Sequence, residues 1–73
     1  MLKAYRVIRR NRKYEYTKEI LYTSLNPQAA ENFALNLIEE QNNIRRNFFK
    51  AKKYIPDIDR ALNDYYEVIP VMI

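Results

Sequence analysis

Positively charged side chains are concentrated in two blocks of the sequence, and each block lies beside aromatic residues. Residues 1–13 contain six cations and no acid, and residues 45–53 contain five cations and no acid. Guanidinium and ammonium groups pair with phosphate oxygens, and neighbouring aromatic rings stack on nucleobases or fill a pocket in a partner protein. These residue types predict a surface that binds an anionic partner.

The first block surrounds the position where a tight turn is expected. Its candidate contact residues are Arg9, Arg10, Arg12 and Lys13, and Tyr14 follows them directly. A basic hairpin tip can enter a groove of a nucleic acid or contact its phosphates. The alternative interpretation is that these charges keep the protein soluble and protect exposed strand edges from pairing with other chains.

The second block lies on an expected helix. Arg45, Phe49 and Lys52 are spaced by four and three residues, so they share one stripe of that helix. A helix that buries the preceding Phe48 tends to expose Phe49 among cations. The candidate contact residues of this block are Arg45, Arg46, Phe49, Lys52 and Lys53. The alternative is an ordinary solvated face, with Phe49 covered by the C-terminal part of the chain.

Composition argues against the commonest enzyme chemistries. The chain contains no His, Cys, Gly or Trp, so it lacks the usual general base, the thiol nucleophile and the glycines of a phosphate-binding loop. Asp57 and Asp59 could hold a hard cation, but an acidic first turn on a short helix is the simpler interpretation. We therefore expect a non-enzymatic binding protein without a metal or other cofactor.

A chain of 73 residues predicts a single small domain spanning 1–73. Such a domain buries only about 60% of the surface of its unfolded chain, and this one has no Cys for disulfides. We therefore expect a homodimer or a higher oligomer. No apolar run approaches the roughly 18 residues of a membrane span, and the first residues carry charge without an apolar stretch. These features predict a cytoplasmic protein with no membrane partner.

Two strands are expected at the start of the chain, at Leu2–Arg10 and Lys13–Thr23, with Asn11-Arg12 as a two-residue turn. In that register Arg9 faces Tyr14, and one face collects the residues expected to form the core side: Tyr5, Val7, Tyr14, Tyr16, Ile20 and Tyr22. Asn tolerates the positive φ of such a turn, whereas Arg12 is a poor replacement for Gly. A longer loop is the alternative.

A long helix is expected from Pro27, with Asn26 as its cap. Apolar residues then repeat every three or four positions up to Ile55, as in a coiled coil. The predicted oligomer seam consists of Leu37, Gln41, Ile44, Phe48 and Ile55. One unbroken helix would be roughly 43 Å long at about 1.5 Å per residue. The alternative is a break at residues 41–43, after which the second half folds back.

Pro56 should end the long helix. A short helix is expected at Asp57–Asp64, followed by a strand at Tyr65–Ile73 in which Pro70 favours a sheet edge. The predicted class is therefore α+β: a small antiparallel β-hairpin plus a C-terminal strand packed on a long amphipathic α-helix, in ββααβ order.

Two functions fit these features. The first is binding of a nucleic acid or a nucleotide through the two basic blocks. The second is a phage-type small inhibitor that binds and blocks a host protein, in the cytoplasm of the host cell. The high content of residues with AT-rich codons, such as Asn and Ile, is typical of short phage reading frames.

Overall fold

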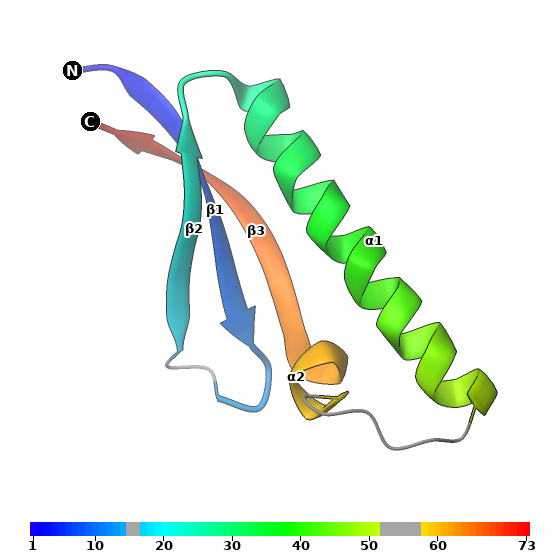
Figure 1. Ribbon diagram of the computed structural model, residues 1–73. Helices are drawn as coiled ribbons and strands as arrows, with labels where there is room; N and C mark the ends of the chain where they lie inside the picture. Colours follow the sequence, from blue (N-terminus) through cyan, green and yellow to red (C-terminus); the bar gives the residue numbers. More distant parts are fainter. Residues whose placement is uncertain (15–16, 52–57) are drawn as a thin grey trace.

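The computed structural model describes residues 1–14, 17–51 and 58–73, apart from the side chains of 51 and 59–61. Its elements follow the chain in the order β1 (Lys3–Asn11), β2 (Lys18–Ser24), α1 (Pro27–Ala51), α2 (Ile58–Asn63) and β3 (Asp64–Met72). The predicted α+β class and the ββααβ order are confirmed (Figure 1).

The three strands form one antiparallel sheet in the order β2-β1-β3. Pairing between β1 and β3 is regular from Lys3 opposite Met72 to Asn11 opposite Asp64. Two backbone hydrogen bonds of 2.8 Å between Leu2 and Ile73 extend it. Pro70 lies on the edge strand β3, as predicted, because proline has no N–H group for a second neighbouring strand.

The predicted two-residue turn at Asn11-Arg12 is wrong. Strand β2 begins at Lys18, so Arg9 pairs with Glu19 and Val7 pairs with Tyr22. The Asn11 side chain explains the wider loop: its Oδ1 accepts hydrogen bonds from the backbone N–H groups of Lys13 and Tyr14, at 2.9 and 3.1 Å. An Asn side chain that replaces backbone partners in this way starts a turn of its own.

The predicted core side of the hairpin is correct for Tyr5, Val7 and Tyr22, which pack in or against the core. It is wrong for Ile20, which is 54% exposed. The register shifts between Val7 and Ile8, so that Tyr22 pairs with Val7 but Ile20 pairs with Ile8. This bulge places Ile20 and Tyr22 on opposite faces, because one extra residue reverses the alternation.

Tyr14 was also predicted on the core side and is instead 47% exposed. It lies in the loop that the Asn11 side chain starts, and so it takes no part in strand pairing. Tyr16, the remaining member of the predicted face, lies outside the described residues.

Helix α1 begins as predicted. Asn26 Oδ1 accepts a hydrogen bond of 2.9 Å from the backbone N–H of Gln28 and so caps the helix. The helix runs unbroken to Ala51, which confirms the continuous alternative and excludes a break at residues 41–43. Residues 52–57, including the predicted helix end at Ile55 and Pro56, lie outside the described part of the chain.

The core forms where the first half of α1 crosses the sheet. Ala30 and Ala34 are buried there against Val7 of β1. Their small side chains let the helix backbone approach the strands, and larger rings close the sides. The rings of Tyr22 and Phe33 stack in parallel at 4.6 Å between centroids.

The apolar repeat of α1 begins with these core alanines, ahead of the predicted seam, so its first turns are occupied by the sheet of the same chain. Gln41 is 7% exposed and donates a hydrogen bond of 2.7 Å from Nε2 to the Asp64 backbone carbonyl. Farther along, Leu37 and Phe48 are half-buried and Ile44 is 37% exposed. Contact between subunits along this seam stays a prediction.

Candidate nucleic-acid interface

A buried polar cluster holds the base of the hairpin loop. Asn11 ends β1, Asp64 begins β3 and Gln41 lies midway along α1, and each is less than a tenth exposed. Asn11 Nδ2 donates to Asp64 Oδ1 at 2.7 Å, and Gln41 Nε2 donates to the Asp64 carbonyl at the same distance. Because buried polar groups are costly without partners, this Asn11–Asp64–Gln41 cluster fixes the loop relative to α1 and β3.

The described residues of the loop, 12–14 and 17, are held by hydrogen bonds. The Arg12 N–H donates to the Asn63 carbonyl at 2.8 Å, which ties the loop to the end of α2. The Thr17 N–H and hydroxyl both donate to the Tyr14 carbonyl, at 2.9 and 2.6 Å. The described part of the loop is thus held at both ends.

The charges of Arg12 and Lys13 are exposed at the tip of this loop. The Arg12 guanidinium lies 5.6 Å from the ring centroid of Tyr65, and Lys13 Nζ lies 5.7 Å from that of Tyr14. These cation–π contacts orient the side chains without cancelling their charge. Within residues 1–14, 17–51 and 58–73, no carboxylate is within ion-pair distance of either cation.

Arg9 and Arg10, directly before the loop, are partly neutralised. Arg9 binds Glu19 on β2 through Nε and Nη2, at 3.1 and 2.5 Å. Arg10 Nε lies 3.5 Å from Glu67 Oε2 on β3. The hydrogen bond to Glu19 raises the pKa of Arg9 above its ordinary value. Burial of the guanidinium opposes this shift, and Tyr66 adds a smaller increase. These two arginines therefore add less to the field at the loop than Arg12 and Lys13.

A cavity of about 260 Å³ lies beside the loop. Seven residues line it: Arg9, Arg10, Asn11, Tyr14, Thr17, Glu19 and Asp64. It contains two carboxylates as well as two guanidinium groups, so the net charge of its lining is close to zero. The cavity therefore fits a neutral, partly apolar group better than a phosphate.

The second basic block is held by fewer contacts. Arg45 is half-buried and donates from Nη2 to the Leu62 carbonyl at 3.1 Å, so it joins α1 to α2. Arg46 is exposed, and its hydrogen bonds within the described residues are to its own helix, through the Asn42 carbonyl at 3.4 Å and the Asn43 side chain at 2.5 Å. Lys50 is exposed, and Lys52 and Lys53 lie outside the described residues.

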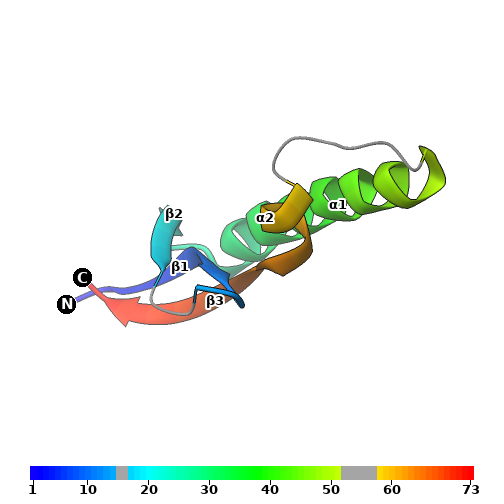
Figure 2. The same ribbon diagram turned by 90° about the horizontal axis from the view of Figure 1, so that it is seen from below.

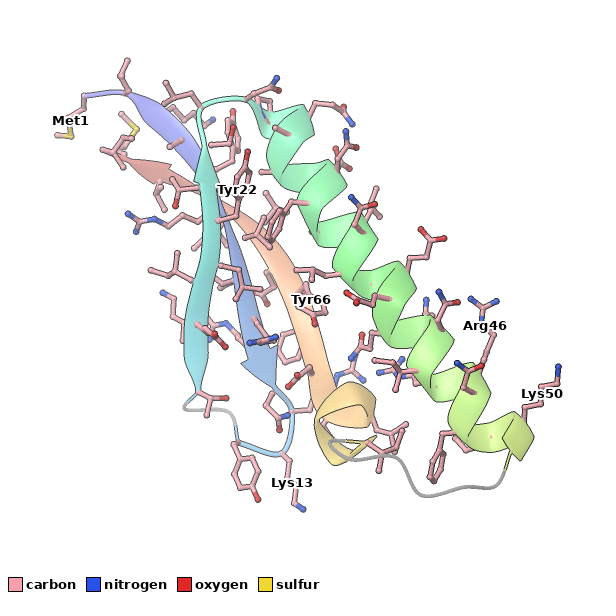
Figure 3. The ribbon with its side chains drawn as sticks, viewed as in Figure 1. Met1, Lys13, Tyr22, Arg46, Lys50 and Tyr66 are labelled. Carbon is pink, nitrogen blue, oxygen red and sulfur yellow. The ribbon has the colours of Figure 1, made fainter. Side chains whose placement is uncertain are left out.

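Phe49 is 65% exposed, whereas Phe48 is half-buried, as the helical spacing predicted. The two rings meet edge to face with 5.4 Å between their centroids. Figure 3 shows Lys13 at the loop and Arg46 and Lys50 on α1 at the same end of the molecule, opposite Met1. The loop residues of the first block and the second block therefore lie toward the same end of the fold, although α2 lies between the loop and the end of α1 in Figure 1.

Sequence reasoning missed the buried cluster and the role of Tyr65. Asn11 and Asp64 are 53 positions apart, so no local pattern connects them. One signal was available: Gln41 is the only polar residue in an otherwise apolar seam, and a polar side chain in such a position needs a buried partner. The sequence could not identify that partner as the first residue of the last strand.

Comparison with protein-family models, with curated proteins and with solved structures finds no match to this chain. Within the described residues, no group of three or more acidic side chains is placed to hold a metal ion. Asp57 and the side chain of Asp59 lie outside that part of the chain. None of the helices described is long and apolar enough to cross a membrane.

Proposed function

We propose that this chain is a non-enzymatic protein that binds a nucleic acid through its hairpin loop. The observation that carries the proposal is the contrast within the first basic block. Arg9 and Arg10 are ion-paired, whereas Arg12 and Lys13 are exposed beside tyrosine rings on a loop that is already fixed. A fixed loop loses little conformational entropy when it binds, so its charges are available to phosphates at low cost.

The contacts at the loop are of two kinds. Arg12 and Lys13 pair with backbone phosphates, which supplies affinity without reading sequence. Tyr14 is 47% exposed and presents a ring on which an unpaired base can stack. Arg46 and Lys50, at the same end of the molecule, extend the positive surface toward neighbouring phosphates. This division of roles favours a single strand over a duplex.

A charge-matched pair of variants tests the proposal. Lys13→Ala and Lys3→Ala each remove one exposed lysine that lies over a tyrosine ring, at 5.7 Å from Tyr14 and 5.8 Å from Tyr5. Fluorescence anisotropy with a labelled single strand, from about 50 to about 200 mM salt, gives the slope of log affinity against log salt. We expect Lys13→Ala to reduce that slope by about 0.7, and Lys3→Ala to leave it unchanged.

Equal losses from the two lysine variants would show that only net charge matters and would remove the loop from the proposal. No binding of any single strand or duplex by the wild-type protein at low salt would overturn the proposed function itself.

A second candidate function rests on Phe49. A phenylalanine that is 65% exposed between Arg46 and Lys50 resembles an aromatic anchor of a protein interface more than a solvated helix face. In that case the chain acts as a small inhibitor, of the type that phages use, and blocks an acidic surface of a host protein. Affinity purification with and without nuclease separates the two functions. A stoichiometric host protein that is retained after nuclease treatment and lost in Phe49→Ala supports the inhibitor.

A further inference from the structure

The sheet has one face that no helix of the described chain covers. Val7 packs against α1, so the neighbouring Ile8 points to the opposite side, because successive side chains of a strand alternate. Figures 1 and 2 show α1 and α2 on the same side of the sheet. Strand pairing places seven apolar residues on the other side, here called the open face: Leu2, Ala4, Ile8, Ile20, Ile69, Val71 and Ile73. The same face carries the charged residues Arg6, Arg10, Lys18 and Glu67.

Three aliphatic side chains of the open face are accessible. Leu2, Ile20 and Ile73 are 60, 54 and 52% exposed, although aliphatic side chains normally form the buried side of a sheet. Ile8 is completely buried at the centre of the face, so its neighbours already pack around it. Exposed aliphatic side chains gathered on one side of a small sheet are typical of an interaction surface.

The surface area of the chain indicates how large the missing contact is. A compact monomer of 8.9 kDa has an accessible surface of roughly 4,800 Å², whereas this chain exposes 5579 Å². The excess, about 800 Å², equals what one partner buries in an interface of standard size. The radius of gyration of 14.2 Å, against about 11 Å for a compact domain of this length, also reflects a thin, open fold.

We propose that a second copy of this chain covers the open face, so that two sheets pack back to back with one α1 on each outer side. Such a contact is isologous: the same surface faces itself across a two-fold axis. Arg6 and Glu67 give this surface charges of both signs, which permits reciprocal pairing between copies.

The second copy fits the open face better than the predicted seam of α1. The apolar repeat that leads into the seam already packs Ala30 and Ala34 in the core, and Gln41 of the seam is hydrogen-bonded to Asp64. Its accessible remainder includes Ile44, which is only 37% exposed. A dimer through the open face also leaves both hairpin loops free. This inference goes beyond nucleic-acid binding and stands without it.

Three lysine substitutions and a mass measurement test the proposal. Ile20→Lys introduces a charge into the open face, and Ile44→Lys introduces one into the seam. Leu35→Lys is the matched control, since Leu35 is 55% exposed on α1, close to the 54% of Ile20. Sedimentation of each variant gives its mass, and circular dichroism shows whether it is folded.

We expect the wild type and Leu35→Lys to have twice the chain mass of 8.9 kDa. Ile20→Lys should fold and sediment at the single-chain mass, with a dissociation constant raised at least tenfold. A monomeric wild type at high micromolar concentration would overturn the proposal. So would an Ile20→Lys variant that stays dimeric while Ile44→Lys dissociates, because that result assigns the contact to the seam. If Ile20→Lys is unfolded, Leu2→Lys, at the accessible edge of the same face, replaces it and must give the single-chain mass.

Discussion

The two basic regions are alike in composition but differ in how the fold holds them. The hairpin loop is fixed by Asn11, by Thr17 and by the Asn63 carbonyl, so the directions of Arg12 and Lys13 are set before any ligand arrives. The end of α1 carries Arg46 and Lys50 on an outer face, and the hydrogen bonds of Arg46 are to its own helix. The same number of positive charges is therefore expected to contribute more to binding at the loop than at the end of α1, because ordered side chains lose less entropy on binding.

The largest effect should follow from Asn11→Ala, which removes the anchor of the loop and no charge. Asn11 makes three hydrogen bonds through its side chain, and its loss leaves Asp64 Oδ1 without that donor. We expect unfolding in urea to show a loss of about 2–3 kcal/mol. Binding to single strands should weaken as well, since Arg12 and Lys13 lose their fixed positions.

Asn47→Ala is the control for the other region, because Asn47 is exposed on α1 near Arg46. It should change the free energy of unfolding by less than about 0.5 kcal/mol. If Asn11→Ala is as mild as this control, the loop is not anchored in the way described, and the contrast between the regions disappears.

The next effect concerns charge itself. The double variants Arg12→Ala/Lys13→Ala and Arg46→Ala/Lys50→Ala each remove two positive charges, one pair from each region. We expect the loop variant to lower the salt slope of single-strand binding by about 1.4. The helix variant should lower it by less than half as much. Anisotropy titrations at several salt concentrations measure both slopes. A larger change of slope in the helix variant would show that the end of α1, and not the loop, contributes most of the phosphate contacts.

The class and element order of the fold followed from local patterns in the sequence. The Asn26-Pro27 start and the repeat from Ala30 onward identified α1, and Pro70 identified an edge strand. The predicted length of the hairpin loop was wrong, because that length depends on side-chain hydrogen bonds such as those of Asn11. The bulge that turns Ile20 outward arises from the pairing between two strands. It cannot be predicted from the alternation of residues along one strand.

For the candidate site, the sequence identified the charges but not their pairing. Arg9, Arg10, Arg12 and Lys13 were equivalent members of one block. The structure separates them, because Glu19 and Glu67 reach only the first two. That distinction requires the register of both strand pairs, and the register depended on the loop.

The smallest expected effect is that of Glu19→Gln. This variant removes the ion pair of Arg9 and so tests whether the arginine is neutralised by that pair. The pair is partly exposed, with 26% of the Arg9 side chain and 54% of the Glu19 side chain accessible, so its loss should cost less than about 1 kcal/mol. The pKa of Arg9 is raised by the Glu19 hydrogen bond. A raised pKa on a cation stabilises the fold at every pH below the pKa of the unfolded chain and loses this effect only as pH rises through the higher pKa of the folded chain.

The difference in unfolding free energy between the wild type and Glu19→Gln should therefore be the same at pH 7 and pH 9. Urea titrations at these two values measure it, and a difference that decreases toward pH 9 would mean that some other group controls the pair. The same variant should bind single strands more tightly and with a steeper salt slope, because Arg9 then becomes available to a phosphate. An unchanged slope would mean that the neutralised arginines lie outside the binding surface, which would confine it to the loop tip.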